Sequence, residues 1–277
     1  MFKYTETEDN TINLFIDITT VCNLNCPYCF ARKDKKWDEV QTLDRIKYIL
    51  KCTKFSRFDF NILLFGGEAL AHPNIEEIVN ECNSNTKVLN TVILTNGCIK
   101  GKYGLDAIYV FTLHDINITE YNAFKDNLKI PGDAIVNVVL TQTELFKMRY
   151  IELDTLGYKI EHSMVYDDDT IVNEDLSDML FLNMGDKEYL YDGILYNYRD
   201  YFKIHKKIIP KDIGLCTIQE LNIAIDGSIS NDCNNVMDNI FTNPMFFKSY
   251  NNKFDCQRSE CTDCTGTIRT TKDMTLI

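Results

Sequence analysis

The sequence predicts an α/β fold in which a parallel, barrel-like sheet is followed by a small, cysteine-rich β-hairpin unit. Short apolar runs alternate with segments of helical period over residues 1–166, which is typical of repeated βα units with parallel strands. From Asp167 the helical period weakens, and after residue 214 a hairpin pattern is followed by a short polar tail rich in cysteine.

Six apolar runs of strand length are expected to form the sheet, and four segments of helical spacing connect them. The strands are expected at Asn13 to Thr19, Asn61 to Phe65, Thr91 to Thr95, Ile108 to Leu113, Ile135 to Leu140 and Ile160 to Val165. The helices are expected at Leu43 to Phe55, Ile75 to Cys82, Thr119 to Leu128, with Thr119 as its cap, and Glu144 to Leu156. In such folds the chemistry gathers in the loops that follow the carboxyl ends of the strands.

The sequence after the barrel divides into two parts. Residues 167–214 open with three aspartates and have weak periodicity, so they form a bridging segment between a first domain, 1–166, and a last domain, 215–277. In that last domain Leu221 to Ile225 and Ser228 to Ser230 read as a hairpin, because Asp226-Gly227 supplies the positive φ angles of a tight turn.

Composition and charge exclude several classes of protein. The chain has 277 residues, 45% hydrophobic and 25% charged, which is ordinary globular usage. A net charge of −12 repels a phosphate backbone, so no nucleic acid partner is expected. The N-terminus lacks a signal-peptide pattern and no run approaches ~18 apolar residues, so a cytoplasmic protein without a membrane partner is expected. Eleven cysteines in a reducing compartment then indicate metal binding rather than disulfides.

The sharpest motif is Cys22-Asn23-Leu24-Asn25-Cys26-Pro27-Tyr28-Cys29, directly after the first expected strand. Three thiolates on one loop can ligate three irons of a [4Fe-4S] cluster and leave the fourth iron open to a cofactor or substrate. A zinc site and three coincidentally close thiols are the alternatives, although a closed zinc site needs a fourth ligand.

Two further motifs end the second and third expected strands. Gly66-Gly67-Glu68 follows the second strand and Thr95-Asn96-Gly97 closes the third. Each alone is compatible with an ordinary turn, since Gly-Gly and Asn-Gly are common turn pairs. Their occurrence after successive strands, downstream of the cysteines, favours a shared function.

These residues resemble the radical S-adenosylmethionine (SAM) superfamily, whose signature C-x3-C-x-aromatic-C is met by Cys22, Cys26, Tyr28 and Cys29. The resemblance implies a partial (β/α)6 TIM-like barrel in which Gly66, Gly67 and Glu68 receive the SAM ammonium group. It also implies that Thr95 and Asn96 contact the ribose or methionine part. SAM is then reduced by one electron, from an external reductant of the flavodoxin or ferredoxin type, to a 5′-deoxyadenosyl radical that takes hydrogen from substrate.

A second cysteine group lies near the C-terminus. Its spacing suits either a [4Fe-4S] cluster or structural zinc. The group resembles the twitch domain, a shortened form of the SPASM extension of radical SAM enzymes, with Gly227 as the hairpin glycine. That resemblance implies one auxiliary [4Fe-4S] cluster, with Cys256 as a spare or alternative ligand. The implied ligands are Cys216, Cys233, Cys261 and Cys264.

Other chemistry-bearing residues are weaker candidates. His114, ending the fourth strand, and Tyr166, just after the sixth, are candidate catalytic residues that could face the barrel mouth, with His162 behind them. His72 and His205 are expected at the surface. No role is expected for Cys52, Cys82 and Cys98.

The leading hypothesis is a radical SAM oxidoreductase that abstracts hydrogen from a substrate carbon and passes the resulting electron to the auxiliary cluster. The expected substrate is a peptide or protein side chain, which would be modified or cross-linked. The close alternative is a small-molecule substrate, with dehydrogenation of a polyol, sugar or aminocyclitol. A non-enzymatic iron-sulfur or zinc protein is the distant alternative.

Overall fold

A computed structural model describes most of the N-terminal two thirds of the chain and parts of the remainder. The described residues are 10–26, 29, 39–99, 102–114, 116–131, 134–140, 148–149, 152–153, 155–164, 166–167, 170–171, 188–191, 194–197, 215–217, 220–231, 236–251, 253–255 and 275–276. For the described residues within 138–140, 159–217 and 253–276, only the backbone is described. The chain divides into two compact units, Met1–Val165 with Glu220–Tyr250, and Tyr166–Gln219 with Asn251–Ile277.

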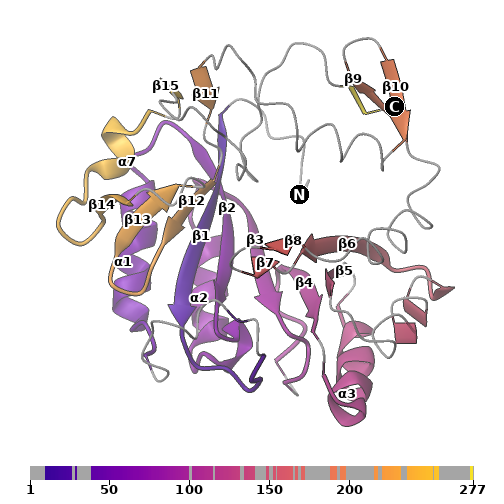
Figure 1. The fold of residues 1–277 in the computed structure, drawn as a ribbon. Coiled ribbons are helices and arrows are strands. Elements are labelled where there is room, and N and C mark those ends of the chain that lie inside the picture. The colour runs from indigo at the N-terminus through magenta and orange to yellow at the C-terminus, as the bar shows by residue number, and fades with distance from the viewer. Residues whose placement is uncertain are drawn as a thin grey trace. The chain divides into compact units, whose positions relative to one another are not determined.

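The first unit is built on a nine-stranded sheet in the order β14-β13-β12-β1-β2-β3-β4-β5-β6 (Figure 1). Strands β1 to β6 pair in parallel, in sequence order, as the alternating pattern predicts. All six expected strands are confirmed. They are β1 (Thr11–Thr19), β2 (Asp59–Gly66), β3 (Val88–Thr95), β4 (Ile108–Leu113), β5 (Ala134–Leu140) and β6 (Lys159–Met164).

Three of the four expected helices are confirmed, and the fourth lies partly outside the described residues. They are α1 (Leu43–Thr53), α2 (Ile75–Asn83) and α3 (Ile118–Leu128), and residues 148–149, 152–153 and 155 of the fourth are helical. Thr119 is not the cap of α3. The cap is Asn117, whose side chain accepts from the N–H groups of Thr119 and Glu120. The Glu120 side chain in turn accepts from the Asn117 N–H, which completes a capping box.

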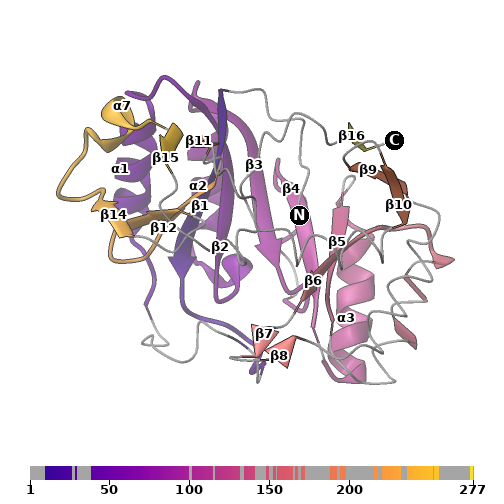
Figure 2. The same ribbon diagram turned by 45° about the horizontal axis from the view of Figure 1, so that its top comes forward.

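Strand β1 is buried on both faces, which fits a parallel sheet flanked by other elements. Ile12, Leu14, Ile16 and Ile18 are fully buried on it. Figures 1 and 2 show α1 and α2 side by side against the sheet near β1 and β2. A short helix, α7 (Phe246–Ser249), adds Phe247, whose ring meets Phe60 of β2 edge to face at 5.3 Å.

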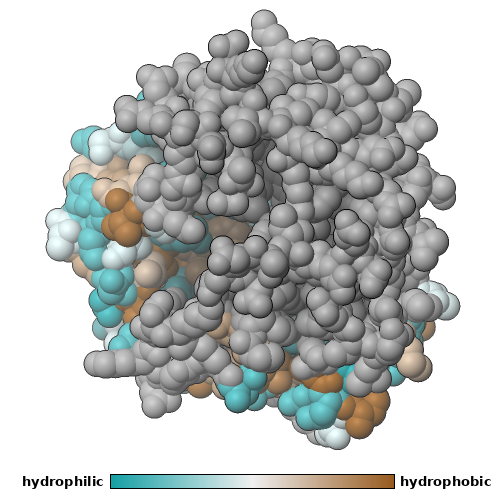
Figure 3. Space-filling model, viewed as in Figure 1, coloured by the Kyte–Doolittle hydropathy of each residue, from teal (hydrophilic) through white to brown (hydrophobic). Residues whose placement is uncertain are grey.

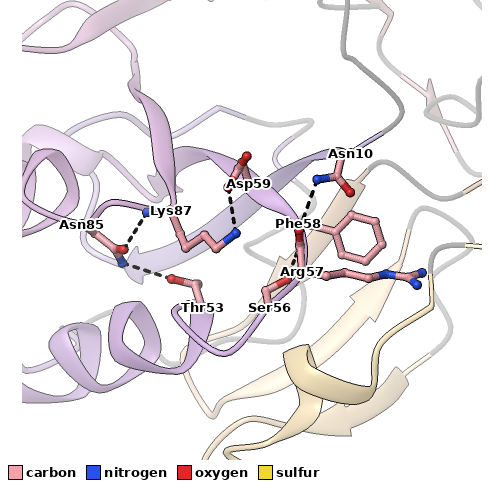
Figure 4. A network of polar contacts seen from close by, with 8 residues as sticks. All are labelled: Asn10, Thr53, Ser56, Arg57, Phe58, Asp59, Asn85 and Lys87. Carbon is pink, nitrogen blue, oxygen red and sulfur yellow. Dashed lines mark hydrogen bonds and ion pairs between the residues drawn. The ribbon is translucent and has the colours of Figure 1, made fainter.

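Polar contacts at the amino ends of β2 and β3 tie these strands to α1 (Figure 4). Asn85 Nδ2 donates to Leu50 O and to Thr53 Oγ1 at the end of α1. Lys87 Nζ lies 3.0 Å from Asp59 Oδ1, which joins the starts of the two strands. These contacts fix the edge of the sheet opposite to the three motifs.

The expected hairpin is present, but it extends the main sheet. Strands β12 (Glu220–Ile223) and β13 (Ser228–Asn231) pair antiparallel, and β12 runs parallel to β1, with β14 (Val236–Asn239) beyond them. Gly227 has φ +88°, and a Cβ there would lie 2.2 Å from the Phe241 ring. The compact unit that contains the barrel strands therefore includes Glu220–Tyr250, a division that differs from the expected boundary between residues 214 and 215.

In the second unit, three small antiparallel groups are described. They are β7 (Tyr166–Asp167) with β8 (Thr170–Ile171), β9 (Glu188–Tyr191) with β10 (Ile194–Asn197) and β16 (Thr275–Leu276), and β11 (Leu215–Thr217) with β15 (Lys253–Asp255).

Polar and apolar residues are intermixed on the described part of the surface in Figure 3. Val236, at 72% exposure on β14, is the most exposed large hydrophobic residue of the described part. Single exposed apolar residues of this kind are ordinary. Within the described residues, no helix has the length and apolar character needed to cross a membrane.

Candidate functional site

The chain segments that leave β1 and β2 are hydrogen-bonded to each other at the carboxyl edge of the sheet. The N–H of Gly67 donates to Thr19 O at 2.6 Å, and the N–H of Glu68 donates to Val21 O at 2.8 Å. The start of the cysteine loop is therefore held against the Gly-Gly-Glu motif by backbone contacts.

The two glycines of that motif are required by this close approach. Gly66 has φ +141°, and a Cβ there would lie 2.1 Å from Thr19 O and 2.6 Å from Asp17 Oδ1. A Cβ on Gly67 would lie 2.4 Å from Val21 O. Because backbone atoms cannot give way as a flexible side chain can, only glycine fits at both positions.

Glu68 joins the end of β2 to the end of β3. Its Oε1 accepts from the Leu70 N–H at 3.0 Å and from Thr95 Oγ1 at 2.8 Å, and its Oε2 accepts from the Asn96 N–H at 2.7 Å. Burial raises the pKa of this carboxyl to about 7, although the hydrogen bonds act in the opposite direction. The sequence pattern does not predict this structural role of Glu68. The contact of Glu68 with SAM stays a prediction.

The turn Thr95-Asn96-Gly97 is held from two sides. Asn96 Nδ2 donates to Asn23 Oδ1 at 2.8 Å and to Cys22 Sγ at 3.8 Å, so the turn contacts the cysteine loop directly. On the other side, Asn127 Nδ2 of α3 donates to Gly97 O at 2.8 Å. Sequence reasoning missed Asn127, because a single asparagine in an amphipathic helix carries no distinguishing signal.

The three cysteines of the first motif are half-buried. Cys22 Sγ accepts from the Leu24 N–H at 3.4 Å as well as from Asn96, while burial raises the pKa of its thiol. Three soft sulfur donors on one loop, one of them facing N–H groups, fit an iron-sulfur cluster, whose sulfurs commonly accept such hydrogen bonds. Tyr28 lies outside the described residues.

Among the residues that the structure describes, no group of three or more His, Cys, Asp or Glu side chains is arranged to hold a single metal ion.

Cys98 lies beside the site, although no role was expected for it. Its Sγ donates to Asn96 O at 3.3 Å. Burial, together with the neighbouring Glu120 and Glu68 carboxylates, raises the pKa of its thiol to about 12. Cys52 and Cys82 are buried thiols on α1 and α2, as expected.

The histidines differ from one another. His114 follows β4, and burial lowers its pKa to about 4, so its imidazole is neutral near neutral pH. His72 is fully buried, and the expectation of a surface residue is wrong. Its Nδ1 accepts from the Asn74 N–H, so its Nε2–H donates to Gln41 O at 2.8 Å. His162 and Tyr166 lie on β6 and β7, where only the backbone is described, and His205 lies outside the described residues.

Only one of the four expected auxiliary ligands is described. Cys216 lies on β11, where its backbone pairs with Phe254 of β15. Phe254 precedes Cys256 by two residues in the sequence. Cys233, Cys256, Cys261 and Cys264 lie outside the described residues, so the auxiliary cluster stays a prediction.

The sequence profile of the Radical SAM superfamily matches residues 16–104. Among curated proteins, the chain is 32% identical to the GTP 3′,8-cyclase of Alkaliphilus oremlandii over 109 residues, which cover 38% of this chain and 33% of that protein. It is 36% identical to an uncharacterized protein of Methanocaldococcus jannaschii over 80 residues, 28% of this chain and 27% of that protein. The matched segments thus span only about a third of these relatives.

Three solved structures share the fold over most of this chain. One is anSMEcpe with bound AdoMet and Cp18Cys peptide, with a TM-score of 0.54, 15% identity, and coverage of 85% of this chain and 80% of that one. Another is Streptococcus suis SuiB bound to precursor peptide SuiA, with a TM-score of 0.55, 14% identity, and coverage of 89% and 62%. The third is BtrN in complex with AdoMet and 2-DOIA, with a TM-score of 0.50, 14% identity, and coverage of 94% of both chains.

Proposed function

Because residues 16–104 of this chain form a radical SAM domain, we propose that the protein is a radical SAM oxidoreductase that abstracts hydrogen from a substrate carbon. Membership of that superfamily implies a [4Fe-4S] cluster and SAM as its cofactors. In this proposal Cys22, Cys26 and Cys29 ligate the cluster, and SAM lies beside it.

The observation that carries the proposal is the physical connection between the three motifs. Cys22 contacts Asn96 through Asn96 Nδ2, and Asn96 is bonded to Glu68 through its backbone N–H. The cysteine loop, the Gly-Gly-Glu motif and the Thr-Asn-Gly turn therefore form one hydrogen-bonded edge. Such an edge, at the carboxyl ends of parallel strands, is where barrel enzymes place their chemistry.

When bound, the cluster and SAM would supply the radical chemistry, with one electron taken from an external flavodoxin-type or ferredoxin-type reductant and one hydrogen atom taken from the substrate. The residues of this chain position the cysteine loop and the turn that contacts it. The Gly66-Gly67 backbone holds the cysteine loop against β2, and Glu68 and Thr95 fix the turn that contacts Cys22. His114, neutral near pH 7, is a hydrogen-bonding candidate beyond β4.

In the same proposal an auxiliary [4Fe-4S] cluster would supply an acceptor for the electron that oxidation of the substrate releases. Cys216, Cys233, Cys261 and Cys264 are its proposed ligands. Four thiolates without an open iron suit an electron acceptor, because each iron is then ligated by protein.

We propose a peptide or protein side chain as the substrate. Support comes from anSMEcpe and SuiB, which share the fold and are solved with peptides bound. The match to GTP 3′,8-cyclases reaches 38% of this chain in the Alkaliphilus oremlandii protein, so it supports the domain rather than a nucleotide substrate.

A small aminocyclitol or polyol is the second candidate. BtrN, solved with 2-DOIA, covers 94% of this chain and is itself covered to 94%, so the two chains match along nearly their whole lengths. The fold of this chain is therefore also found in a protein that was solved with a small molecule.

The activity is tested by incubating anaerobically reconstituted protein with SAM and dithionite, and measuring 5′-deoxyadenosine by mass spectrometry. We expect product from the wild type and none from Cys26→Ala. A Cys52→Ala variant, which removes a buried thiol from α1, is the matched control and should keep the activity. Wild-type protein that carries a cluster and yet forms no 5′-deoxyadenosine would refute the proposal.

The substrate class is tested by deuterium transfer. A deuterated synthetic peptide and a deuterated aminocyclitol are offered in separate reactions. Deuterium in the 5′-deoxyadenosine identifies the molecule from which hydrogen is taken. Transfer from the aminocyclitol alone would contradict the peptide assignment.

A further inference from the structure

The Cys22 sulfur lies where two N–H groups converge. The backbone N–H of Leu24 donates to it at 3.4 Å, and the side-chain Nδ2 of Asn96 donates to it at 3.8 Å. The Leu24 contact belongs to the loop itself. The Asn96 contact comes from the turn that follows β3, 74 residues along the chain, so it depends on the fold.

The neighbours of Asn96 fix the direction of its amide group. Its Oδ1 accepts from the Cys98 N–H at 2.9 Å, so Nδ2 must point to the other side, where it donates to Asn23 Oδ1 at 2.8 Å. A primary amide carries two N–H bonds. One serves Asn23, and the second remains for the Cys22 sulfur.

The backbone beneath this amide is also held. Glu68 Oε2 accepts from the Asn96 N–H at 2.7 Å, and Asn127 holds the carbonyls of Gly97 and Ile99. Asn96 is 5% exposed, so water competes little for its amide. A weak N–H···S contact is more effective in such a site, because the local dielectric is low.

We propose that Asn96 is a positioning residue whose side-chain N–H donates to the Cys22 sulfur and raises the reduction potential of the cluster held there. This inference rests on the proposed function. One-electron reduction increases the negative charge on the cluster and its sulfur ligands, so an N–H dipole aimed at a ligand sulfur stabilises the reduced state. The amide is therefore engaged by protein atoms on both of its ends before SAM arrives.

The first arm of the test measures the midpoint potential of the reconstituted cluster without SAM, by redox titration monitored with electron paramagnetic resonance. Asn96→Leu removes the donor without adding charge, and Asn96→Asp replaces it with a carboxylate. Asn23→Ser is the matched control, because it removes the other partner of Nδ2 and leaves the sulfur contact. Iron content and circular dichroism verify that each variant is folded and loaded.

We expect the potential to fall in Asn96→Leu, to fall further in Asn96→Asp, and to stay at the wild-type value in Asn23→Ser. The exchangeable-proton coupling in electron–nuclear double resonance should lose one component in Asn96→Leu and keep it in Asn23→Ser. A potential that moves in Asn96→Asp alone would overturn the inference, because charge and not the hydrogen bond would then be responsible.

The second arm uses apoprotein and separates this inference from the proposed function. Iodoacetamide labelling at fixed pH, followed by peptide mapping, gives the alkylation rate of each cysteine. Asn96→Leu should slow Cys22 several-fold relative to Cys26 and Cys29, since the donor stabilises the thiolate. Equal relative rates in wild type and variant would refute the hydrogen bond. Wild-type protein that assembles no cluster would instead refute the proposed function and the claim about the potential.

Discussion

The Glu68 carboxylate accepts a hydrogen bond from the backbone N–H of Asn96 at 2.7 Å, so a fully buried acid joins the end of β2 to the end of β3. The same asparagine contacts Cys22 through its side chain. The relationship explains how the cysteine loop is positioned by two strands other than the one it follows.

Removal of the Glu68 charge should change how stability depends on pH. Its pKa is raised from 4.5 to about 7, so the folded protein holds the proton more tightly than the unfolded chain. The contribution of Glu68 to the free energy of unfolding is therefore fully present below the pKa of the unfolded chain, and it is lost as the pH rises through the pKa of the folded protein. It amounts to about 3 kcal/mol over that window.

Urea denaturation of apoprotein at pH 5 and at pH 8 measures this effect. The stability of wild type relative to Glu68→Gln should be greater at pH 5, because glutamine has no charge to bury. A difference between the two proteins that is constant with pH would show that Glu68 ionises at its ordinary pKa, and a difference that grows with pH would show that folding lowers this pKa.

Substitution of Gly66 should destabilise the protein by steric overlap. In Gly66→Ala the new Cβ would meet the Thr19 carbonyl oxygen at 2.1 Å, which forces the exits of β1 and β2 apart. Gly104→Ala is the control, because Gly104 also has a positive φ, +99°, but nothing lies within 4 Å of its Cβ position. Backbone strain costs about 1–2 kcal/mol at either site, and we expect Gly66→Ala to cost clearly more.

Thermal unfolding of the two glycine variants gives the comparison. Gly66→Ala should also lose iron on reconstitution, since it displaces the cysteine loop, whereas Gly104→Ala should not. Equal melting temperatures for the two variants would mean that the segments leaving β1 and β2 have room for a Cβ at residue 66.

His114 should remain neutral well below pH 6. Burial lowers its pKa from 6.5 to about 4, so its contribution to stability is present above pH 6.5 and is lost as the pH falls toward 4. The Cε1–H resonance of His114, assigned by comparison with His114→Gln, should show no titration between pH 8 and about pH 5. A midpoint near 6.5 would place this imidazole in water.

The parallel core was predictable because β1 to β5 are largely apolar runs between polar segments, and helices α1 to α3 carry a helical period. The order of β12 beside β1 was not predictable, since a hairpin pattern does not say which sheet edge it joins. His72 was placed at the surface wrongly: a histidine next to Pro73-Asn74 reads as a loop residue, and only the fold brings Gln41 O to its Nε2.

The candidate site was predicted as three separate motifs, and the structure shows how they are joined. The spacing of the cysteines and the glycines after β2 is visible in the sequence. Three hydrogen bonds join residues that are far apart in the sequence: Asn96 to Glu68, Asn96 to Cys22, and Asn127 to Gly97. No period or spacing in a single sequence encodes such contacts.

The central claim is that Cys22, Cys26 and Cys29 hold an iron-sulfur cluster. Iron and sulfide content, with Mössbauer spectra, should be measured on anaerobically reconstituted wild type and on the triple variant Cys22→Ala, Cys26→Ala, Cys29→Ala. About eight irons per chain falling to about four, with [4Fe-4S] spectra in both, is the expected result. A triple variant that retains all the iron of the wild type would contradict the assignment of the cluster to this loop.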